Sequence, residues 1–195
     1  TRSGPVEYAE LGTGPVVLVV HGAGGGFDQG LKLLEPLASR GFRLLAISRF
    51  GYLRTPMPAN PSTIAQADAH AHLMDALGIH SAAIFGVSAG GPSSLQFAIR
   101  HPRRCAALVL MVPIAYKPPE PDAAATKLPP LVEKMLTTIA GADFAYLLVS
   151  KLSPDTIIKV VMATPPEAVA SASEDEQARV DDFMKHILPI SSRIR

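Results

Sequence analysis

Four runs of largely apolar residues occur in the first half of the chain, and turn residues separate them. The runs hold five to seven residues each, rich in Val, Ile and Leu, and span residues 16–20, 42–47, 82–87 and 106–112. Runs of this length and composition are typical of strands buried on both faces of a parallel sheet. A shorter segment of mixed polarity, Glu7–Leu11, predicts one further strand.

Helix signals lie between the apolar runs. Serine is a strong N-cap residue, glycine commonly follows the end of a helix, and a helix stops before proline. These rules predict helices over residues 31–40 before Gly41, 62–77 with Ser62 as the cap and Gln66 near the third helical position, and 92–100 before Pro102. The alternation of strand and helix predicts an α/β fold, a mostly parallel doubly wound sheet with helices on both faces.

The composition changes after Pro113. Ten of the eighteen prolines lie between Pro113 and Pro189, and this part has no clear strand pattern. Apolar residues recur there at helical spacing, in residues 131–139, 142–151, 155–163 and 174–188. We therefore predict a core unit over residues 1–115, a helical insertion over residues 116–190 that sits on the sheet, and a clipped or linker end at residues 191–195.

Composition and charge narrow the classes of function. The chain has 195 residues, 48% of them apolar, which suits one domain with a large core. Its net charge is +1 and no run of Lys or Arg exceeds two residues, which argues against a nucleic-acid partner. The longest apolar run, about ten residues, is too short to span a bilayer. We expect a soluble protein without a membrane partner and assign no compartment.

Other features argue against cofactors. Cys105 is the single cysteine, so it forms no internal disulfide. No pair of Cys, His or carboxylate residues has the spacing of a metal site. The glycines from Gly24 to Gly26 fit neither the G-x-G-x-x-G pattern of a dinucleotide site nor a phosphate loop, which needs a following Gly-Lys-Ser/Thr. We expect neither a metal nor another cofactor.

The most informative motif is the G-x-S-x-G pentapeptide at residues 86–90, with Ser88 at its centre. It ends the apolar run at residues 82–87 and precedes the helix predicted at residues 92–100. A sharp turn from a strand into a helix pushes one side chain out at the top of a sheet, and flanking glycines allow close backbone packing there. The Ser88 hydroxyl would be an exposed nucleophile beside a helix N-terminus, which favours negative charge.

A second motif, His21-Gly22-Ala23-Gly24-Gly25-Gly26, follows the first strong strand. With both motifs in this order, residues 4–113 resemble the α/β-hydrolase family, in particular its serine esterases, and residues 116–189 resemble the helical cap of that family by position and composition. The resemblance implies that Ser88 is the nucleophile. It also implies that the backbone N–H groups of Ala89 and Ala23, with Gly24 as the alternative to Ala23, stabilise the oxyanion. His21 would have a structural role in its loop.

A serine nucleophile needs a histidine base and an acid, which in this family follow the serine along the chain. His101 lies at the far end of the helix that starts beside Ser88, roughly 15–20 Å away at ~1.5 Å per residue, so it cannot be the base. His186 has no preceding strand and loop, so we favour a polar position on a helix face over a role as the base. Before Ser88, we interpret three histidines as solvated or core residues: His70, His72 and His80.

The acid is also missing from its usual place. Glu120 and Asp122 follow the fourth apolar run, where some family members place the acid, but we favour solvated charges in a proline-rich linker. The run at residues 106–112 has no polar residue, which is typical of a central strand rather than an edge. We therefore expect that these residues are the N-terminal portion of a longer hydrolase. A complementary C-terminal segment or second chain would supply the other strands, the acid and the histidine.

A few residues are candidates for substrate contacts. Asp28 and Gln29 follow the glycine-rich loop and would either line the pocket or cap the next helix. Met111, in the last apolar run, is a candidate for the apolar lining. Arg49 and Arg54 would either contact a carboxylate substrate or stabilise their loop by bonding carbonyl groups.

We therefore expect a serine hydrolase that transfers an acyl group from a small, mainly apolar ester to Ser88 and then to water. Carbon–carbon bond hydrolysis or perhydrolysis on the same fold is the second interpretation. The serine nucleophile disfavours dehalogenation, because that reaction resembles the chemistry of family members with an aspartate nucleophile. The third interpretation is a non-catalytic protein of the same fold that binds a small molecule.

Overall fold

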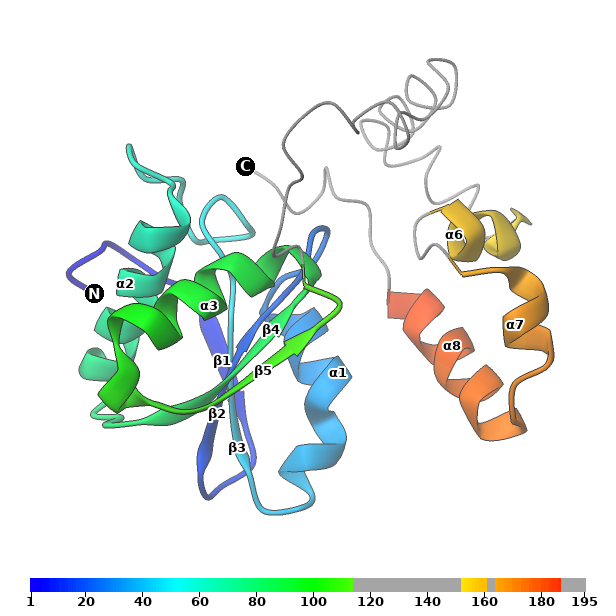
Figure 1. The fold of residues 1–195 in the computed structure, drawn as a ribbon, viewed down its shortest axis with the longest axis horizontal. Helices are drawn as coiled ribbons and strands as arrows, with labels where there is room; N and C mark the ends of the chain where they lie inside the picture. The colour runs from blue at the N-terminus through cyan, green and yellow to red at the C-terminus, as the bar shows by residue number, and fades with distance from the viewer. Residues whose placement is uncertain (114–151, 161–163, 187–195) are drawn as a thin grey trace. The chain divides into compact units, whose positions relative to one another are not determined.

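The computed structural model describes residues 1–113, 152–160 and 164–186 (Figure 1). The chain divides into two compact units, residues 1–122 with 193–195 and residues 123–192. The boundary predicted at residue 115 lies outside the described residues, so the three-part division stays a prediction. The helices predicted at residues 131–139 and 142–151 also lie outside them.

Five strands form one sheet in the first unit, in the order β1-β3-β2-β4-β5. β1 runs antiparallel to β3, and the other neighbours are parallel. This confirms the predicted mostly parallel sheet. The strands are β1 (Tyr8–Leu11), β2 (Val16–Val20), β3 (Arg43–Ile47), β4 (Ala82–Val87) and β5 (Cys105–Met111), within one residue of the predicted runs at each end.

Three α-helices accompany this sheet: α1 (Phe27–Ala38), α2 (Thr63–Ala76) and α3 (Gly91–Arg100). Ser62 caps α2 as predicted, because its Oγ accepts the Ala65 N–H at 3.1 Å. α1 begins four residues before the predicted start at residue 31. The Phe27 N–H reaches the Ser48 Oγ at 3.4 Å, so a contact from the end of β3 supports the first turn. Because Ser48 is 21 residues away along the chain, local helix propensity could not predict this contact.

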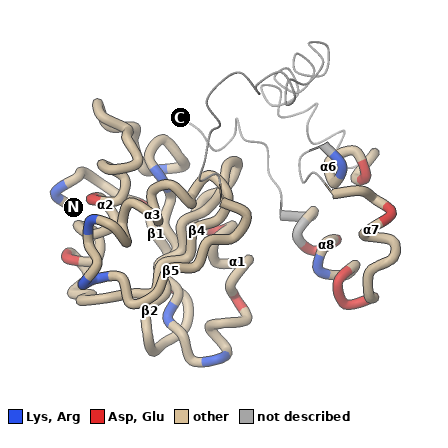
Figure 2. The backbone as a smooth tube through the Cα atoms, viewed as in Figure 1, with Lys and Arg blue, Asp and Glu red and all other residues tan. Residues whose placement is uncertain are grey.

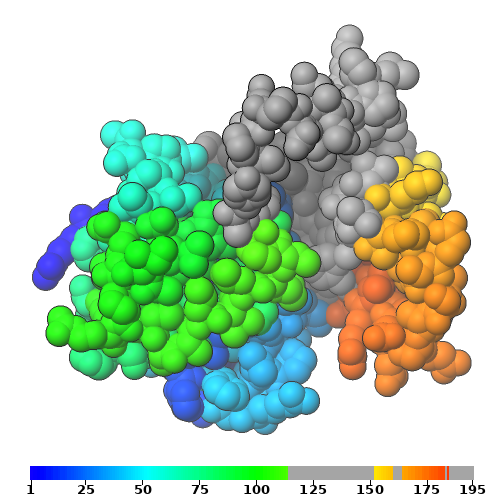
Figure 3. All heavy atoms as spheres, viewed as in Figure 1, coloured from blue at the N-terminus to red at the C-terminus, as the bar shows by residue number. Residues whose placement is uncertain are grey.

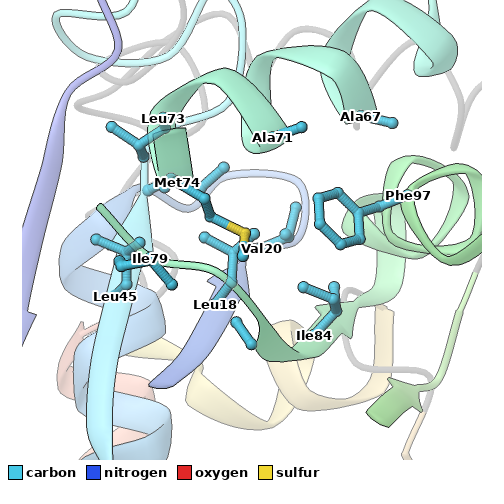
Figure 4. Packing of buried hydrophobic residues seen from close by; sticks show 12 residues of the cluster. Leu18, Val20, Leu45, Ala67, Ala71, Leu73, Met74, Ile79, Ile84 and Phe97 are labelled. Carbon is cyan, nitrogen blue, oxygen red and sulfur yellow. The ribbon is translucent and has the colours of Figure 1, made fainter. Parts of the chain in front are cut away.

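One face of the sheet packs against α2 and α3 (Figure 4). In that view the Met74 side chain of α2 points toward Leu18 and Val20 of β2, and Phe97 of α3 lies above Ile84 of β4. All five side chains are fully buried. Burying large aliphatic and aromatic side chains of this kind stabilises the fold by about 1.5–3 kcal/mol each.

The opposite face packs against α1. Val17 and Val19 of β2 join Leu44 and Ala46 of β3, and Leu34 of α1 covers them. Successive strand residues point to opposite faces, so β2 and β3 need apolar residues at every position. This requirement explains why the strands are continuous apolar runs in the sequence.

The second unit contains three described helices, α6 (Pro154–Val160), α7 (Pro166–Ala170) and α8 (Glu174–His186). α8 begins with a reciprocal cap between Ser173 and Glu176, whose backbone N–H groups each face the other's side-chain oxygen at 3.4 Å. Basic and acidic positions are interspersed along the described backbone (Figure 2). In the described ranges, every helix is too short or too polar to cross a membrane.

β5 forms one edge of the sheet as far as the described residues show. Its exposed positions are apolar: Ala106, Ala107 and Val109, the last with 45% of its surface exposed. The space-filling view places β5 on the visible face of the first unit (Figure 3). An exposed, wholly apolar edge strand is a template for pairing with another strand. The predicted neighbour for β5 stays a prediction.

A buried histidine lies between α2 and α3. His70 is 1% exposed, its Nε2 lies 3.4 Å from the Ser93 Oγ, and its ring faces that of Phe97. Burial lowers the pKa of His70 to about 3, and the charge of Arg49 contributes in the same direction. His70 is therefore neutral in the folded protein at ordinary pH.

We expect the stability of the first unit to fall on acidification because of His70. The unfolded chain protonates this residue near pH 6.5 and the folded chain only near pH 3, so the contribution is complete above pH 6.5 and is lost as the pH falls to about 3. The loss should reach about 2 kcal/mol by pH 5. Urea unfolding at several pH values measures it. His70→Gln should flatten the slope and the exposed His80→Gln should retain it; equal slopes would contradict the expectation.

Candidate active site

Ser88 lies at the turn between β4 and α3. A single 3-10 turn, Ser88–Gly90, links the strand to the helix, and Ser88 has a φ of +45°. This left-handed conformation is uncommon for residues other than glycine, and surrounding packing must maintain it. Strained backbone of this kind gathers at functional sites. The strand–turn–helix geometry that the pentapeptide predicts is therefore present, with the half-buried Ser88 at its tip.

The two glycines of the pentapeptide allow this turn to pack closely. A Cβ atom at Gly86 would lie 2.8 Å from the Ser94 Cβ and closer still to its Oγ. A Cβ atom at Gly90 would overlap the carbonyl oxygens of Val20 and His21, the latter at 2.7 Å. The start of α3 thus touches the backbone at the end of β2, and a side chain at either glycine would separate them.

The glycine-rich loop lies beside Ser88. A Cβ atom at Gly22 would be 3.3 Å from the Ser88 Cβ, so the two backbones are neighbours. Ala23 and Gly24 follow directly, Ala23 exposed and Gly24 with a φ of +70°. The structure therefore brings the start of the loop and the serine together. The assignment of Ala23, Gly24 and Ala89 to the oxyanion hole stays a prediction.

His21 connects this loop to the segment after β3. Its ring is buried, its Nδ1 donates to the Gly22 carbonyl at 2.7 Å, and its Nε2 accepts the Arg49 N–H at 3.0 Å. These partners select the neutral ring with its proton on Nδ1. Because both nitrogens are engaged, His21 supports the loop and does not act as the base for Ser88.

Arg49 bonds a carbonyl group, which is one of the two roles expected of it. Its guanidinium donates to the His21 carbonyl at 3.3 Å and lies 5.0 Å from the centre of the Tyr52 ring. Burial lowers the pKa of Arg49. Arg54 is exposed, and its guanidinium lies 3.7 Å from Glu7. The two arginines thus differ, because Arg49 is half-buried beside His21 and Arg54 lies on the surface.

The three predicted substrate contacts lie near the loop or the turn. Asp28 is half-buried in the first turn of α1, and Gln29 packs on Gly25, where a Cβ atom would be 2.8 Å from the Gln29 Cδ. Met111 pairs with Val87, the residue before Ser88, in the register of β4 and β5. Their contact with a substrate stays a prediction.

No histidine of the described residues hydrogen-bonds to Ser88. His101 lies at the C-terminal cap of α3, the end of the helix predicted for it, and bonds to Asp68 at 2.9 Å. Glu120, Asp122 and the side chain of His186 lie outside the described residues. The described ranges also contain no cluster of three or more His, Cys, Asp or Glu side chains that could hold a metal.

Comparison with known proteins identifies the family. The family profile described as alpha/beta hydrolase fold matches residues 15–153. The chain belongs to the α/β-hydrolase fold family. This confirms the resemblance drawn from the two glycine-containing motifs.

Proteins similar to this α/β-hydrolase include named hydrolases and proteins of known structure. A 2-hydroxy-6-oxo-6-phenylhexa-2,4-dienoate hydrolase of Comamonas testosteroni is 33% identical over 113 residues, 55% of this chain and 40% of that protein. An alpha/beta hydrolase fold protein from Nakamurella multipartita is 30% identical at a TM-score of 0.63, covering 98% of this chain and 65% of that one. An epoxide hydrolase from an endophytic Streptomyces is 32% identical at a TM-score of 0.53, covering 56% of this chain and 34% of that one. The chain thus spans less than two thirds of each.

The sequence predicts Gln66 only as a residue near the start of the helix at residues 62–77, with no part in the site. The structure directs its Oε1 to the Phe50 N–H at 2.7 Å, in the loop after β3. A glutamine near the start of a helix is ordinary, so the sequence held no signal for this contact. The partner is sixteen residues away along the chain, and tertiary packing brings it close.

We expect Gly86→Ala to destabilise this α/β-hydrolase by about 1–3 kcal/mol, because the new methyl group overlaps the Ser94 side chain. Ser94→Gly removes that obstacle, so the double variant should be more stable than the sum of the single effects by about 0.5–3 kcal/mol. Urea unfolding of the four proteins measures this coupling. Gly90→Ala is the matched contrast: its methyl group meets backbone oxygens, and Ser94→Gly should not rescue it. Strict additivity in the Gly86 cycle would contradict the packing argument.

Proposed function

We propose that this chain carries the nucleophile of a serine hydrolase. Ser88 attacks the carbonyl carbon of a small, mainly apolar ester, and water then releases the acyl group. The N–H groups of Ala89 and of Ala23 or Gly24 stabilise the oxyanion, which preorganised donors do without rearranging. The observation that supports this most is the left-handed Ser88 between β4 and α3, packed against Gly22.

The base and acid of the proposed reaction come from outside the described residues. His21 has both ring nitrogens engaged, and His70 and His101 have side-chain partners in Ser93 and Asp68. We assign the base and acid to a C-terminal segment that continues the sheet beside β5. The apolar, exposed edge of β5 supports this assignment, as does the 40% of the Comamonas relative that the chain spans. The reaction as proposed uses no cofactor.

Carbon–carbon bond hydrolysis is the second candidate function. The relative with 33% identity is named as a hydrolase of 2-hydroxy-6-oxo-6-phenylhexa-2,4-dienoate, and several other relatives have names of the same kind. Such a substrate also offers a carbonyl group to a serine and an oxyanion hole. The two candidates therefore share the site and differ in the bond that breaks.

Ser88→Ala should abolish covalent labelling of the complete protein by a fluorophosphonate probe, because the probe reacts with an activated serine oxygen. Hydrolysis of 4-nitrophenyl butyrate should fall by at least ~10³-fold. Ser81→Ala, an exposed serine just before β4, is the matched control and should keep both signals. Circular dichroism checks the fold. Labelling that persists in Ser88→Ala would end the proposal.

The two reactions can be separated by steady-state kinetics on the complete protein. Specificity is the ratio of the kcat/KM values for two substrates. Because we propose ester hydrolysis, we expect kcat/KM for 4-nitrophenyl butyrate to exceed that for 2-hydroxy-6-oxo-6-phenylhexa-2,4-dienoate by at least about tenfold. The reverse ratio would replace ester hydrolysis by carbon–carbon bond hydrolysis. Ser88→Ala should remove whichever activity is found, which ties it to the same site.

A further inference from the structure

A pocket of about 290 Å³ opens beside the turn that carries Ser88. The loop after β3 contributes Arg49 and Tyr52 to its wall, and the start of α2 contributes Ser62, Thr63 and Gln66. Ala89, the residue after the proposed nucleophile, completes the wall on the side of the turn. We call this the α2 pocket. A ligand in this pocket would lie beside Ala89, the residue that follows Ser88 in the sequence.

Gln66 lines this pocket and has an unused hydrogen-bond donor. The residue is 6% exposed, and its Oε1 is held by the Phe50 N–H. Its Nε2 is buried and has no hydrogen-bond partner in the described structure. Turning the amide over would place two donors against each other at Phe50, so the observed orientation is the favoured one. A buried donor without a partner is costly, and an acceptor atom in the pocket would remove that cost.

Arg49 adds a positive charge without a carboxylate partner among the described residues. Its guanidinium contacts the His21 carbonyl and the Tyr52 ring, both uncharged groups. A half-buried guanidinium favours a carboxylate or phosphate, which it can bind through two parallel hydrogen bonds. None of the residues that line the α2 pocket is acidic. A ligand can therefore supply the negative charge that pairs with Arg49.

The start of α2 favours the same kind of ligand. The helix has fourteen residues, and its first turn contains no acidic side chain. The N-terminus of a helix of this length carries a partial positive charge and free N–H groups. With Gln66 and Arg49, three sources of hydrogen-bond donors or positive charge meet at one pocket, two from α2 and one from the loop after β3. The rest of the wall includes apolar and aromatic side chains such as Phe50 and Met57.

We propose that the α2 pocket binds a carboxylate carried by the substrate. This rests on the proposed function, because it places the reacting carbonyl at Ser88 and the acid group in the pocket beyond Ala89. The substrate class is thus an acyl compound with an apolar body and a carboxylate at its end. Gln66 and Arg49 act as binding residues, and neither takes part in bond making.

Binding can be tested without turnover. Glutarate, titrated calorimetrically into the complete protein carrying Ser88→Ala, should bind more tightly than uncharged glutaramide. Gln66→Glu keeps an oxygen for the Phe50 N–H and replaces the free donor by a negative charge, so glutarate affinity should fall at least about tenfold. Arg49→Met should give a similar loss. Arg54→Met removes the same charge from the 84% exposed side chain of the same loop and should leave the affinity unchanged.

Kinetics on the protein with Ser88 intact test whether the bound carboxylate belongs to the substrate. The ratio of kcat/KM for 4-nitrophenyl hydrogen glutarate to that for 4-nitrophenyl butyrate should fall about tenfold or more in Gln66→Glu and in Arg49→Met, and stay constant in Arg54→Met. Unchanged glutarate affinity in both pocket variants overturns the proposal. Weakened glutarate binding with an unchanged ratio also overturns it, because the pocket would then hold a free anion.

Failure of this inference and failure of the proposed function give different results. If Ser88 is not the nucleophile, fluorophosphonate labelling persists in Ser88→Ala, while glutarate binding and its dependence on Gln66 remain. If the α2 pocket does not bind carboxylates, Ser88 is labelled as before and the pocket variants bind glutarate like the parent protein.

Discussion

The end of β2 and the start of α3 meet with no room for a side chain between them. Gly90 lies against the carbonyl oxygens of Val20 and His21, and Gly22 lies against the Ser88 Cβ. Glycine has no Cβ atom and therefore allows a backbone to approach this closely. This close approach places the loop after β2 beside the serine, and the geometry of the proposed site depends on it.

The parallel sheet brings the other parts of the site to the same edge. β2, β3 and β4 are parallel neighbours, so the segments that follow them leave the sheet at one end. His21, after β2, then receives the backbone N–H of Arg49, after β3. A single buried, uncharged ring thus holds two of the three loops together. Ser88 follows β4 and completes the group.

Hydrogen-bond donors are distributed unevenly around this edge. The acceptor groups near His21 and Phe50 are matched by donors, whereas Gln66 and Arg49, which line the α2 pocket, have a buried donor without a partner and a charge without an acidic partner in the described structure. A ligand with acceptor atoms can pair with these donors. The same edge lacks a described histidine in contact with Ser88, so the described residues hold the nucleophile side of the proposed chemistry.

The sequence alone determined the strands, their mostly parallel arrangement and the turn at Ser88. A strand buried on both faces must be apolar at every position, and a tight turn between strand and helix needs glycines at set positions, so both leave local patterns. Tertiary structure decided the early start of α1, the burial of His70, the partners of His21 and the use of Gln66. Each of these depends on an atom from a distant segment, such as the Ser48 Oγ or the Phe50 N–H. Such contacts exist only once the sheet has brought its loops together, and they leave no periodic trace in the chain.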